Sequence, residues 1–260
     1  MNRSPQVFSL LKDIVRKALS KTGYAVLRER DRYHQDGVFT VHGDHFRACT
    51  EFREAYCRGI VASHGVDAAI EWRVHVALWA ASTSLRVSGD FVECGVNAGF
   101  MSSAMMHHLR WNQLGRRFYL IDTFSGPVLQ QYSPEEAQRG RLKVAENAIA
   151  AGAYVTDLER VYANFAEWPS AVVVPGVVPD VLSTLKMGPV AFLHLDMNCA
   201  YPERAAFEFF WNRLEPGAIV LLDDYAYSGH EEQTRALDEA ARSVGVEILS
   251  LPTGQGLITK

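Results

Sequence analysis

The strongest constraint on the fold is a series of short apolar runs that begins near residue 89 and alternates with helical segments. The runs cover residues 90–96, 117–124, 171–176, 190–196 and 218–225. Each is almost continuously hydrophobic, as strands covered on both faces are. Because helical segments separate them, the strands are expected to be parallel and joined by right-handed crossovers.

The C-terminal end of the chain departs from this alternation. Apolar runs at residues 246–252 and 256–260 are separated only by Thr253, Gly254 and Gln255. This spacing predicts a terminal hairpin, which would add antiparallel strands to the sheet. We therefore expect a doubly wound α/β fold with a mostly parallel, seven-stranded sheet and an antiparallel C-terminal hairpin.

The first part of the chain lacks this pattern. Residues 1–84 are expected to form an N-terminal helical extension, serving as an acceptor lid or an oligomer contact, and residues 85–260 the main domain. The helix at its start could lie on a membrane surface, or pack on its own domain or a second subunit. Apolar spacing predicts helices at 5–20, 46–64 and 66–84, and the polar composition of 28–45 predicts a loop or weak hairpin.

Composition excludes several classes of protein. The chain has 260 residues and a net charge of -4, so it lacks the basic footprint of a nucleic-acid binder. Charges interrupt every apolar stretch near the N-terminus, and no stretch approaches the roughly 18 apolar residues of a membrane span. Its 4 cysteines show no metal-ligand spacing. We expect a cytoplasmic protein with free thiols.

The first predicted strand ends in a glycine turn, Glu93-Cys94-Gly95-Val96-Asn97-Ala98-Gly99. Gly95 would allow the chain to turn sharply, and Gly99 would allow the next helix to approach a ligand closely. The spacing is G-x-x-x-G, which differs from the G-x-G-x-x-G fingerprint of dinucleotide sites. We therefore expect Glu93, Gly95, Asn97 and Gly99 to bind a cofactor.

Two acids indicate which cofactor this is. Glu93 would repel the pyrophosphate of a nicotinamide dinucleotide, but it favours the ammonium and sulfonium of S-adenosylmethionine (SAM). The second strand ends in Asp122-Thr123-Phe124, and we expect these three residues to bind the cofactor as well. An acid at this position can accept both hydroxyls of an adenosine ribose. In the alternative interpretation, Glu93 and Asp122 merely cap the ends of their strands.

More acids follow the fourth and fifth predicted strands. Asp196 ends one, and Asp223 and Asp224 end the other. If these strands are neighbours, the carboxylates converge, which is costly unless they are protonated or neutralised. A hard divalent cation such as Mg²⁺ would resolve that cost. Adjacent strand residues point to opposite faces, so Asp223 and Asp224 both bind only if the strand ends there. Alternatively, one aspartate caps the following helix.

Four of these segments resemble the macrocin O-methyltransferase family: GDFVECGVNAG, YLIDTFSG, HLDMNCAYPE and PGAIVLLDDY. The resemblance covers about residues 66–260. It implies a class I methyltransferase fold, SAM as cofactor, Mg²⁺ held by strand-end aspartates, and a sugar hydroxyl as acceptor. Family members that act on macrolides usually carry a second acid soon after the first metal aspartate, whereas this chain has Met197 and Asn198. A surface-polysaccharide sugar or another natural-product sugar is therefore as good an expectation as a macrolide sugar.

Methyl transfer to a hydroxyl also needs a base, and His230 is our preferred candidate, with Asp196 assisting through the metal. In the alternative interpretation, His230 starts a helix and faces solvent. Tyr201 is either part of the acceptor pocket or a rim residue. The expected partner is a small-molecule or glycan acceptor, and a homo-oligomer is an open alternative to a monomer. A nicotinamide oxidoreductase and a non-catalytic SAM-binding scaffold are the competing functions.

Overall fold

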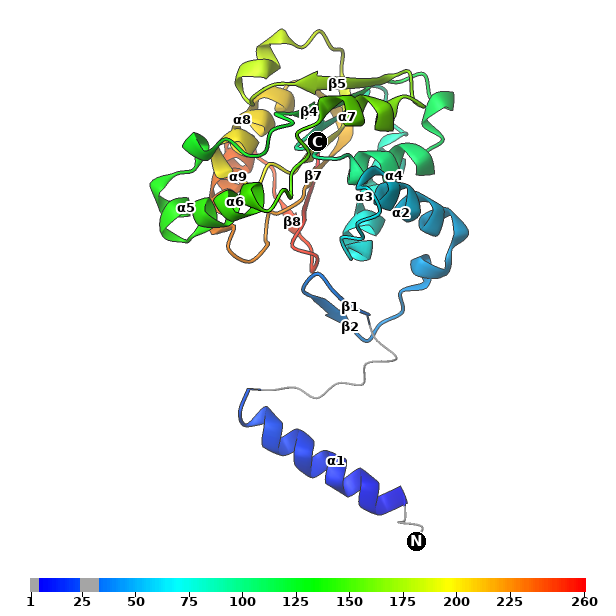
Figure 1. Cartoon of the computed structure of the whole chain (residues 1–260), viewed down its shortest axis with the longest axis vertical. Coiled ribbons are helices and arrows are strands. Elements are labelled where there is room, and N and C mark those ends of the chain that lie inside the picture. The colour runs from blue at the N-terminus through cyan, green and yellow to red at the C-terminus, as the bar shows by residue number, and fades with distance from the viewer. Residues whose placement is uncertain (1–4, 24–32) are drawn as a thin grey trace. The chain divides into compact units, whose positions relative to one another are not determined.

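A computed structural model describes residues 5–23 and 33–260 (Figure 1). The chain divides into two units, one of residues 1–34 and 39–43 and one of residues 35–38 and 44–260. Residues 28–32 of the predicted loop or hairpin lie outside the described part. The first unit contains helix α1 (Pro5–Ser20), and strands β1 (Tyr33–Gln35) and β2 (Val38–Thr40) form a two-stranded sheet.

The second unit is built around a seven-stranded sheet with the order β5-β4-β3-β6-β7-β9-β8. The first five strands pair in parallel, and β9 pairs antiparallel with both β7 and β8. The predicted mostly parallel sheet with an antiparallel C-terminal hairpin is thus confirmed. The strands are β3 (Asp90–Cys94), β4 (Phe118–Asp122), β5 (Ala171–Pro175), β6 (Val190–Leu195), β7 (Leu214–Leu222), β8 (Leu249–Ser250) and β9 (Gly256–Thr259).

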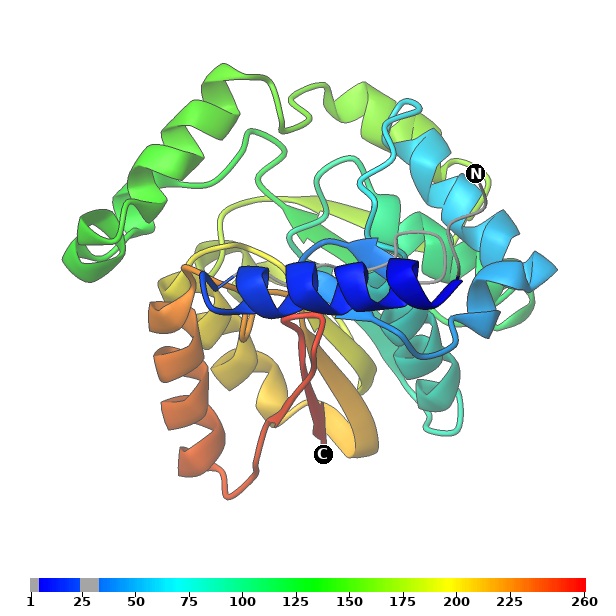
Figure 2. The same cartoon turned by 90° about the horizontal axis from the view of Figure 1, so that it is seen from below.

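Helices cover both faces of this sheet (Figure 2). Each face of the sheet packs in its own hydrophobic core cluster. Successive residues of β3 show this, because Phe91 belongs to one cluster and Val92 to the other. Side chains alternate between the faces of a strand, so a strand buried on both faces must be apolar throughout. One face packs on α2 (Thr50–Ala62), α3 (Glu71–Ser84), α4 (Phe100–His108) and α7 (Leu158–Phe165), and the other on α8 (Ala200–Trp211) and α9 (Glu231–Ser243).

The helices predicted at 46–64 and 66–84 are present as α2 and α3, preceded by a short 3-10 helix at His45–Ala48. Buried residues of both, such as Phe52 and Val74, belong to the same core cluster as the sheet. Two further helices, α5 (Pro134–Gln138) and α6 (Arg141–Ala150), lie between β4 and α7. None of the helices within the described residues combines the length and hydrophobicity that a membrane crossing needs.

Candidate active site

A cavity of about 500 Å³ lies beyond the carboxyl ends of the parallel strands. Open α/β sheets bind ligands at this edge, and the volume suits a small molecule. The loops after β3, β4, β6 and β7 all contribute to its wall. Most residues predicted from the sequence line it, namely Glu93, Gly95, Asn97, Asp122, Thr123, Asp196, Asp223, Asp224 and His230.

Two predicted cofactor residues are absent from the lining. Gly99 precedes α4 with φ 88°, and a Cβ there would lie 2.5 Å from the Phe165 ring. The glycine therefore serves the packing of α4 on α7, rather than the close approach to a ligand that we expected. Phe124 is only 5% exposed and belongs to the apolar core.

Gly95 forms the predicted sharp turn after β3, with φ 91°. A Cβ at this position would lie 1.8 Å from the backbone oxygen of Asp196. The glycine is thus required twice, by its positive φ and by the close approach of the two loops. It brings the end of β3 against the loop that begins the acidic cluster.

Asp122 holds the glycine turn in place. Its Oδ2 accepts hydrogen bonds from the backbone N–H groups of Val96 at 2.6 Å and Asn97 at 2.8 Å. Its Oδ1 accepts from the N–H of Phe124 at 2.7 Å. A carboxylate has about four acceptor positions, so these three bonds leave one.

The neighbouring hydroxyl does not fill that position. Thr123 Oγ1 lies 3.3 Å from Asp122 Oδ1 and 2.6 Å from the backbone oxygen of Gly126. A hydroxyl has one proton, and the shorter contact takes it. The free position of Asp122 can therefore accept one hydrogen bond from a ligand.

Glu93 is linked to the acidic cluster by His194, a fully buried residue of β6. His194 Nδ1 lies 2.9 Å from Glu93 Oε1, and Nε2 lies 3.6 Å from Asp223 Oδ1. Burial lowers the pKa of His194, but the two carboxylates outweigh it and raise the pKa to about 10. The imidazole is therefore cationic. Glu93 Oε2 is buried and has no partner among the described residues.

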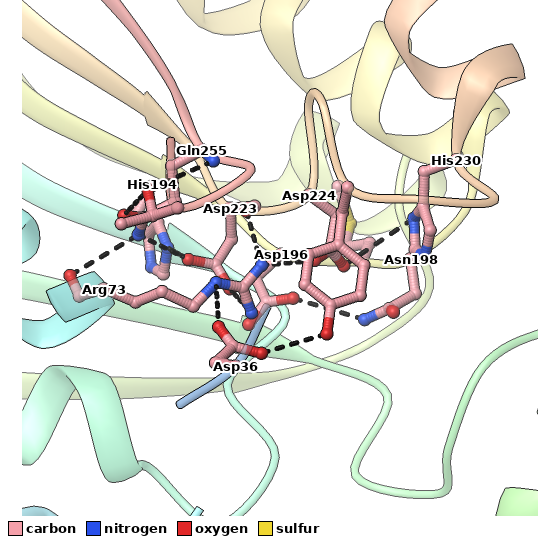
Figure 3. A network of polar contacts seen from close by, with 12 residues as sticks. Asp36, Arg73, His194, Asp196, Asn198, Asp223, Asp224, His230 and Gln255 are labelled. Carbon is pink, nitrogen blue, oxygen red and sulfur yellow. Dashed lines mark hydrogen bonds and ion pairs between the residues drawn. The ribbon is translucent and has the colours of Figure 1, made fainter. Parts of the chain in front are cut away.

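Arg73 of α3 is the centre of the acidic cluster (Figure 3). Its guanidinium lies 2.6 Å from Asp224 Oδ1, 3.1 Å from Asp223 Oδ2 and 3.4 Å from Asp36 Oδ2. Burial lowers the pKa of Arg73, but Asp223 and Asp224 raise it above its ordinary value. One buried cation thus joins three carboxylates from distant parts of the chain.

Strand β7 ends at Leu222, so Asp223 and Asp224 both lie in the loop and both reach the same guanidinium. The geometric condition for using both aspartates is therefore met. Burial raises the pKa of Asp223, but Arg73 and His194 lower it well below its usual value. Asp223 is therefore ionised.

Asp196 lacks an ion pair with Arg73, and its Oδ1 accepts a hydrogen bond from Asn198 Nδ2 at 3.2 Å. Burial, followed by the charges of Asp223 and Asp224, raises its pKa well above the ordinary value. Ligand atoms of His194, Asp196 and Asp223 lie within 4.8 Å of one another. Arg73 and His194 therefore neutralise only part of the negative charge of the cluster.

Asp36 joins the site from the turn between β1 and β2. Its Oδ1 accepts a hydrogen bond from the hydroxyl of Tyr227 at 2.9 Å, and the guanidinium of Arg73 lies 4.9 Å from the Tyr227 ring centre. Burial raises the pKa of Asp36, and Arg73 opposes this. Nothing in the polar run of residues 28–45 distinguished Asp36 from its neighbours.

His230 precedes α9 and is only 4% exposed, so it does not face bulk solvent. Its Nδ1 is hydrogen-bonded to Gln233 Oε1, and it lies 3.8 Å from Asp224 Oδ2. Burial lowers the pKa of His230, although Asp224 opposes this. Tyr201 is 55% exposed and does not line the cavity, so it is a rim residue.

Three features together define the class I SAM-dependent methyltransferase fold. They are the strand order of the sheet, the glycine turn after β3 and the acid Asp122 at the end of β4. Residues 92–225 match the family described as "Methyltransferase domain", and the chain belongs to this family.

A curated relative is 8-demethyl-8-(2,3-dimethoxy-alpha-L-rhamnosyl)-tetracenomycin-C 4'-O-methyltransferase of Streptomyces olivaceus. It is 32% identical over 146 residues, which are 54% of each protein, so the chain spans about half the length of this relative.

Two solved structures share the fold. The O-methyltransferase NovP has a TM-score of 0.63 at 19% identity, with 97% of this chain and 98% of that chain covered. CalS11, a calicheamicin methyltransferase, has a TM-score of 0.54 at 18% identity, with 85% and 98% covered. At these identities, both show similarity of fold alone.

Proposed function

We propose that this protein is a SAM-dependent, Mg²⁺-dependent O-methyltransferase that acts on a sugar hydroxyl of a glycan or natural product, as in the macrocin O-methyltransferase group. The observation that carries the proposal is that one cavity contains both halves of such a site. Glu93 and Asp122 line it after β3 and β4, and Asp196, Asp224 and His230 line it after β6 and β7. The curated relative, by its name, methylates a rhamnosyl oxygen, which favours a sugar acceptor.

The residues after β3 and β4 fit SAM. The partnerless Oε2 of Glu93 suits the ammonium group of SAM, because a buried carboxylate oxygen gains most from a cationic donor. The free acceptor position of Asp122 suits one ribose hydroxyl, rather than the two that the sequence suggested. Gly95, which also lines the cavity, allows the turn after β3 to lie against the loop after β6.

The residues after β6 and β7 fit a hard cation. Asp196, Asp223 and Asp224 supply carboxylate oxygens, the donor type that Mg²⁺ prefers. The raised pKa of Asp196 supports this assignment, because burial and the charges of Asp223 and Asp224 disfavour the ionised carboxylate and a bound cation would favour it. Such an ion would lower the pKa of an acceptor hydroxyl and orient it. Asp36 and Arg73 would form the wall of the acceptor site, which gives the N-terminal extension a role in substrate binding.

His230 would take the proton from the acceptor. The contact between His230 Nδ1 and Gln233 Oε1 favours the tautomer with Nδ1 protonated, which leaves a lone pair on Nε2. The lowered pKa keeps this ring neutral near pH 7. When bound, SAM would supply the methyl group, with the bond to the acceptor oxygen forming as the carbon–sulfur bond breaks and S-adenosylhomocysteine as the leaving group. His230 would hold the proton that the acceptor hydroxyl loses.

A nicotinamide oxidoreductase is not retained, because the chain belongs to a methyltransferase family and Glu93 borders the glycine turn. A measurement of turnover distinguishes the enzyme from a non-catalytic SAM-binding scaffold. Purified protein should release S-adenosylhomocysteine from SAM in the presence of Mg²⁺ and at least one member of a panel of neutral and anionic sugars. EDTA should abolish turnover and leave SAM affinity nearly unchanged. Added Mg²⁺ should restore turnover.

Asp196→Asn is the matched variant, because it removes a charge at nearly constant shape. It should behave like EDTA-treated wild type. Full activity of both the EDTA-treated enzyme and Asp196→Asn would overturn the metal-dependent mechanism. SAM binding without turnover on any sugar of a broad acceptor panel would favour the scaffold.

A further inference from the structure

Two arginines line the cavity, and their surroundings differ sharply. Arg73 lies among three carboxylates, as described above. Arg141 has no carboxylate within ion-pair distance in the described part of the chain. Its Nε is buried without a hydrogen-bond partner, and its Nη2 lies 3.5 Å from Asn198 Oδ1. The half-buried guanidinium of Arg141 therefore has one buried nitrogen without a partner and one long hydrogen bond.

The position of Arg141 on its helix adds to this cost. It is the first residue of α6, after the N-cap Gly140. Helix N-termini carry a partial positive charge, which disfavours a cation and favours an anion. A partly buried cation without a counter-ion is also unfavourable. Local rules broken in this way, without compensation inside the chain, are typical of functional sites.

The surroundings of Arg141 belong to the acceptor half of the cavity. Asn198 lies in the loop after β6 that begins with Asp196. The side chain also runs past the loop after β7, with its Cδ 3.9 Å from the position of a Cβ built on Gly229, the residue before His230. Arg141 thus lies close to both loops that carry the proposed metal ligands and base.

We propose that Arg141 binds an anionic group of the acceptor, a phosphate or a carboxylate attached to the sugar that is methylated. This inference rests on the proposed function, because it identifies the acceptor half of the cavity with these two loops. The planar guanidinium pairs with two oxygens of a phosphate or carboxylate at once. The acceptor would therefore be a sugar phosphate, a nucleotide-linked sugar or a uronic acid, rather than a neutral glycoside.

Calorimetric titrations of the protein saturated with S-adenosylhomocysteine test this proposal. The ligands are L-rhamnose 1-phosphate, D-glucuronate and neutral methyl α-L-rhamnoside, all in EDTA so that no metal can bind the anion. At least one of the two anions should bind roughly tenfold tighter than the neutral sugar, and the better one identifies the group. Arg141→Gln should weaken that binding by about ten- to a hundredfold, the loss typical of hydrogen bonds to charged groups. Arg141→Lys should recover part of it.

Arg139→Gln is the matched control. Arg139 lies two residues away, is exposed, pairs with Glu231 and Glu232, and is outside the cavity lining. It should leave anion binding unchanged. Equal affinity for charged and neutral sugars, or an anion preference that survives Arg141→Gln, overturns the proposal. Weakened S-adenosylhomocysteine binding in Arg141→Gln with the preference intact also overturns it, because Arg141 would then bind the carboxylate of SAM. A wild-type protein that fails to bind S-adenosylhomocysteine refutes the proposed function itself.

Discussion

The two halves of the cavity are built in different ways. After β3 and β4, Asp122 accepts hydrogen bonds from Val96 and Asn97, which lie 26 and 25 residues away in the chain. After β6 and β7, Asp224 pairs with Arg73, which lies 151 residues away. In the first half, backbone N–H groups of the turn after β3 bind a side chain at the end of the adjacent strand β4. In the second half, charged side chains from elements far apart in the sequence pair with one another.

This difference has consequences for stability and chemistry. Backbone N–H groups satisfy Asp122 without any ion, so the first half should be insensitive to metals. The second half holds several carboxylates near few cations, and charged groups that lose a buried partner cost much more than neutral ones. Changes in charge should therefore disrupt the acceptor half and spare the turn that Asp122 holds in the SAM half.

The largest effect should come from Arg73→Met, which keeps most of the side-chain volume but removes the cation. In EDTA, Asp36, Asp223 and Asp224 lose their shared partner, and unfolding free energy should fall by about 3–5 kcal/mol. Mg²⁺ should restore more stability in the variant than it adds to wild type, because the ion replaces the lost charge. Thermal unfolding with and without Mg²⁺ measures both effects.

Arg58→Met is the control for that experiment. Arg58 also bridges elements, with Nε 2.8 Å from Glu167 Oε1 and Nη1 2.8 Å from Asn164 Oδ1, but it does not line the cavity. Its loss should destabilise the protein without rescue by Mg²⁺. Equal rescue of both variants would show that the ion acts elsewhere.

His230→Ala is expected to lower kcat by roughly 10²–10⁴-fold, the usual range for removal of a general base. SAM affinity should stay within about twofold of wild type, because His230 lies 3.8 Å from Asp224 and belongs to the acceptor half. Gln233→Ala should give a smaller loss of kcat, since it removes only the partner that orients the ring. Near-normal turnover of His230→Ala would make this histidine a bystander.

The sheet could be predicted because its signals are local. Continuous apolar runs identify buried strands, and a three-residue gap between the last two identifies the hairpin. The strand-end residues Glu93, Asp122, Asp196 and Asp223 could also be predicted, since parallel strands deliver their carboxyl ends to one edge of the sheet. These inferences need only the order of the elements.

The charges that complete the site could not be predicted in the same way. Arg73 occupies one position of an otherwise ordinary helix, and only the packing of α3 brings it to Asp224. His194 lies within an apolar strand, where a single histidine resembles a core residue. The sequence did offer one signal for His194, because an isolated ionisable residue in an apolar segment usually has a buried partner.

Glu203 offers a smaller, pH-dependent test of the acceptor half. It is fully buried, and its Oε1 accepts hydrogen bonds from the N–H groups of Met197 at 2.9 Å and Asn198 at 3.1 Å. Burial, with the charge of Asp224, raises its pKa from 4.5 to about 7. Between these values the folded state binds the proton and the unfolded state does not, so stability falls as pH rises.

Glu203→Gln removes this titration while keeping the accepting oxygen. Relative to the variant, wild type should lose on the order of 3 kcal/mol between pH 4.5 and pH 7.5. Denaturant unfolding in EDTA at several pH values measures the difference. Glu208→Gln, an exposed position on the same helix, should follow wild type. Parallel curves for wild type and Glu203→Gln would contradict the assignment.

The smallest effect concerns the SAM half and tests whether the two halves are independent. Asp122→Ala should weaken S-adenosylhomocysteine binding by about 1.5–3 kcal/mol, because one hydrogen bond from the ribose to a charged acceptor is lost. The loop at Val96 and Asn97 also loses its clamp, so part of the change should appear as an unfavourable entropy of binding. Thr123→Val is the control, since the Thr123 hydroxyl donates to Gly126 rather than to Asp122, and it should change the affinity little. Calorimetry with and without Mg²⁺ should give the same loss for Asp122→Ala, because no ion takes part in this half. A loss that Mg²⁺ reverses would mean that the two halves share one electrostatic network, and the distinction between them would fail.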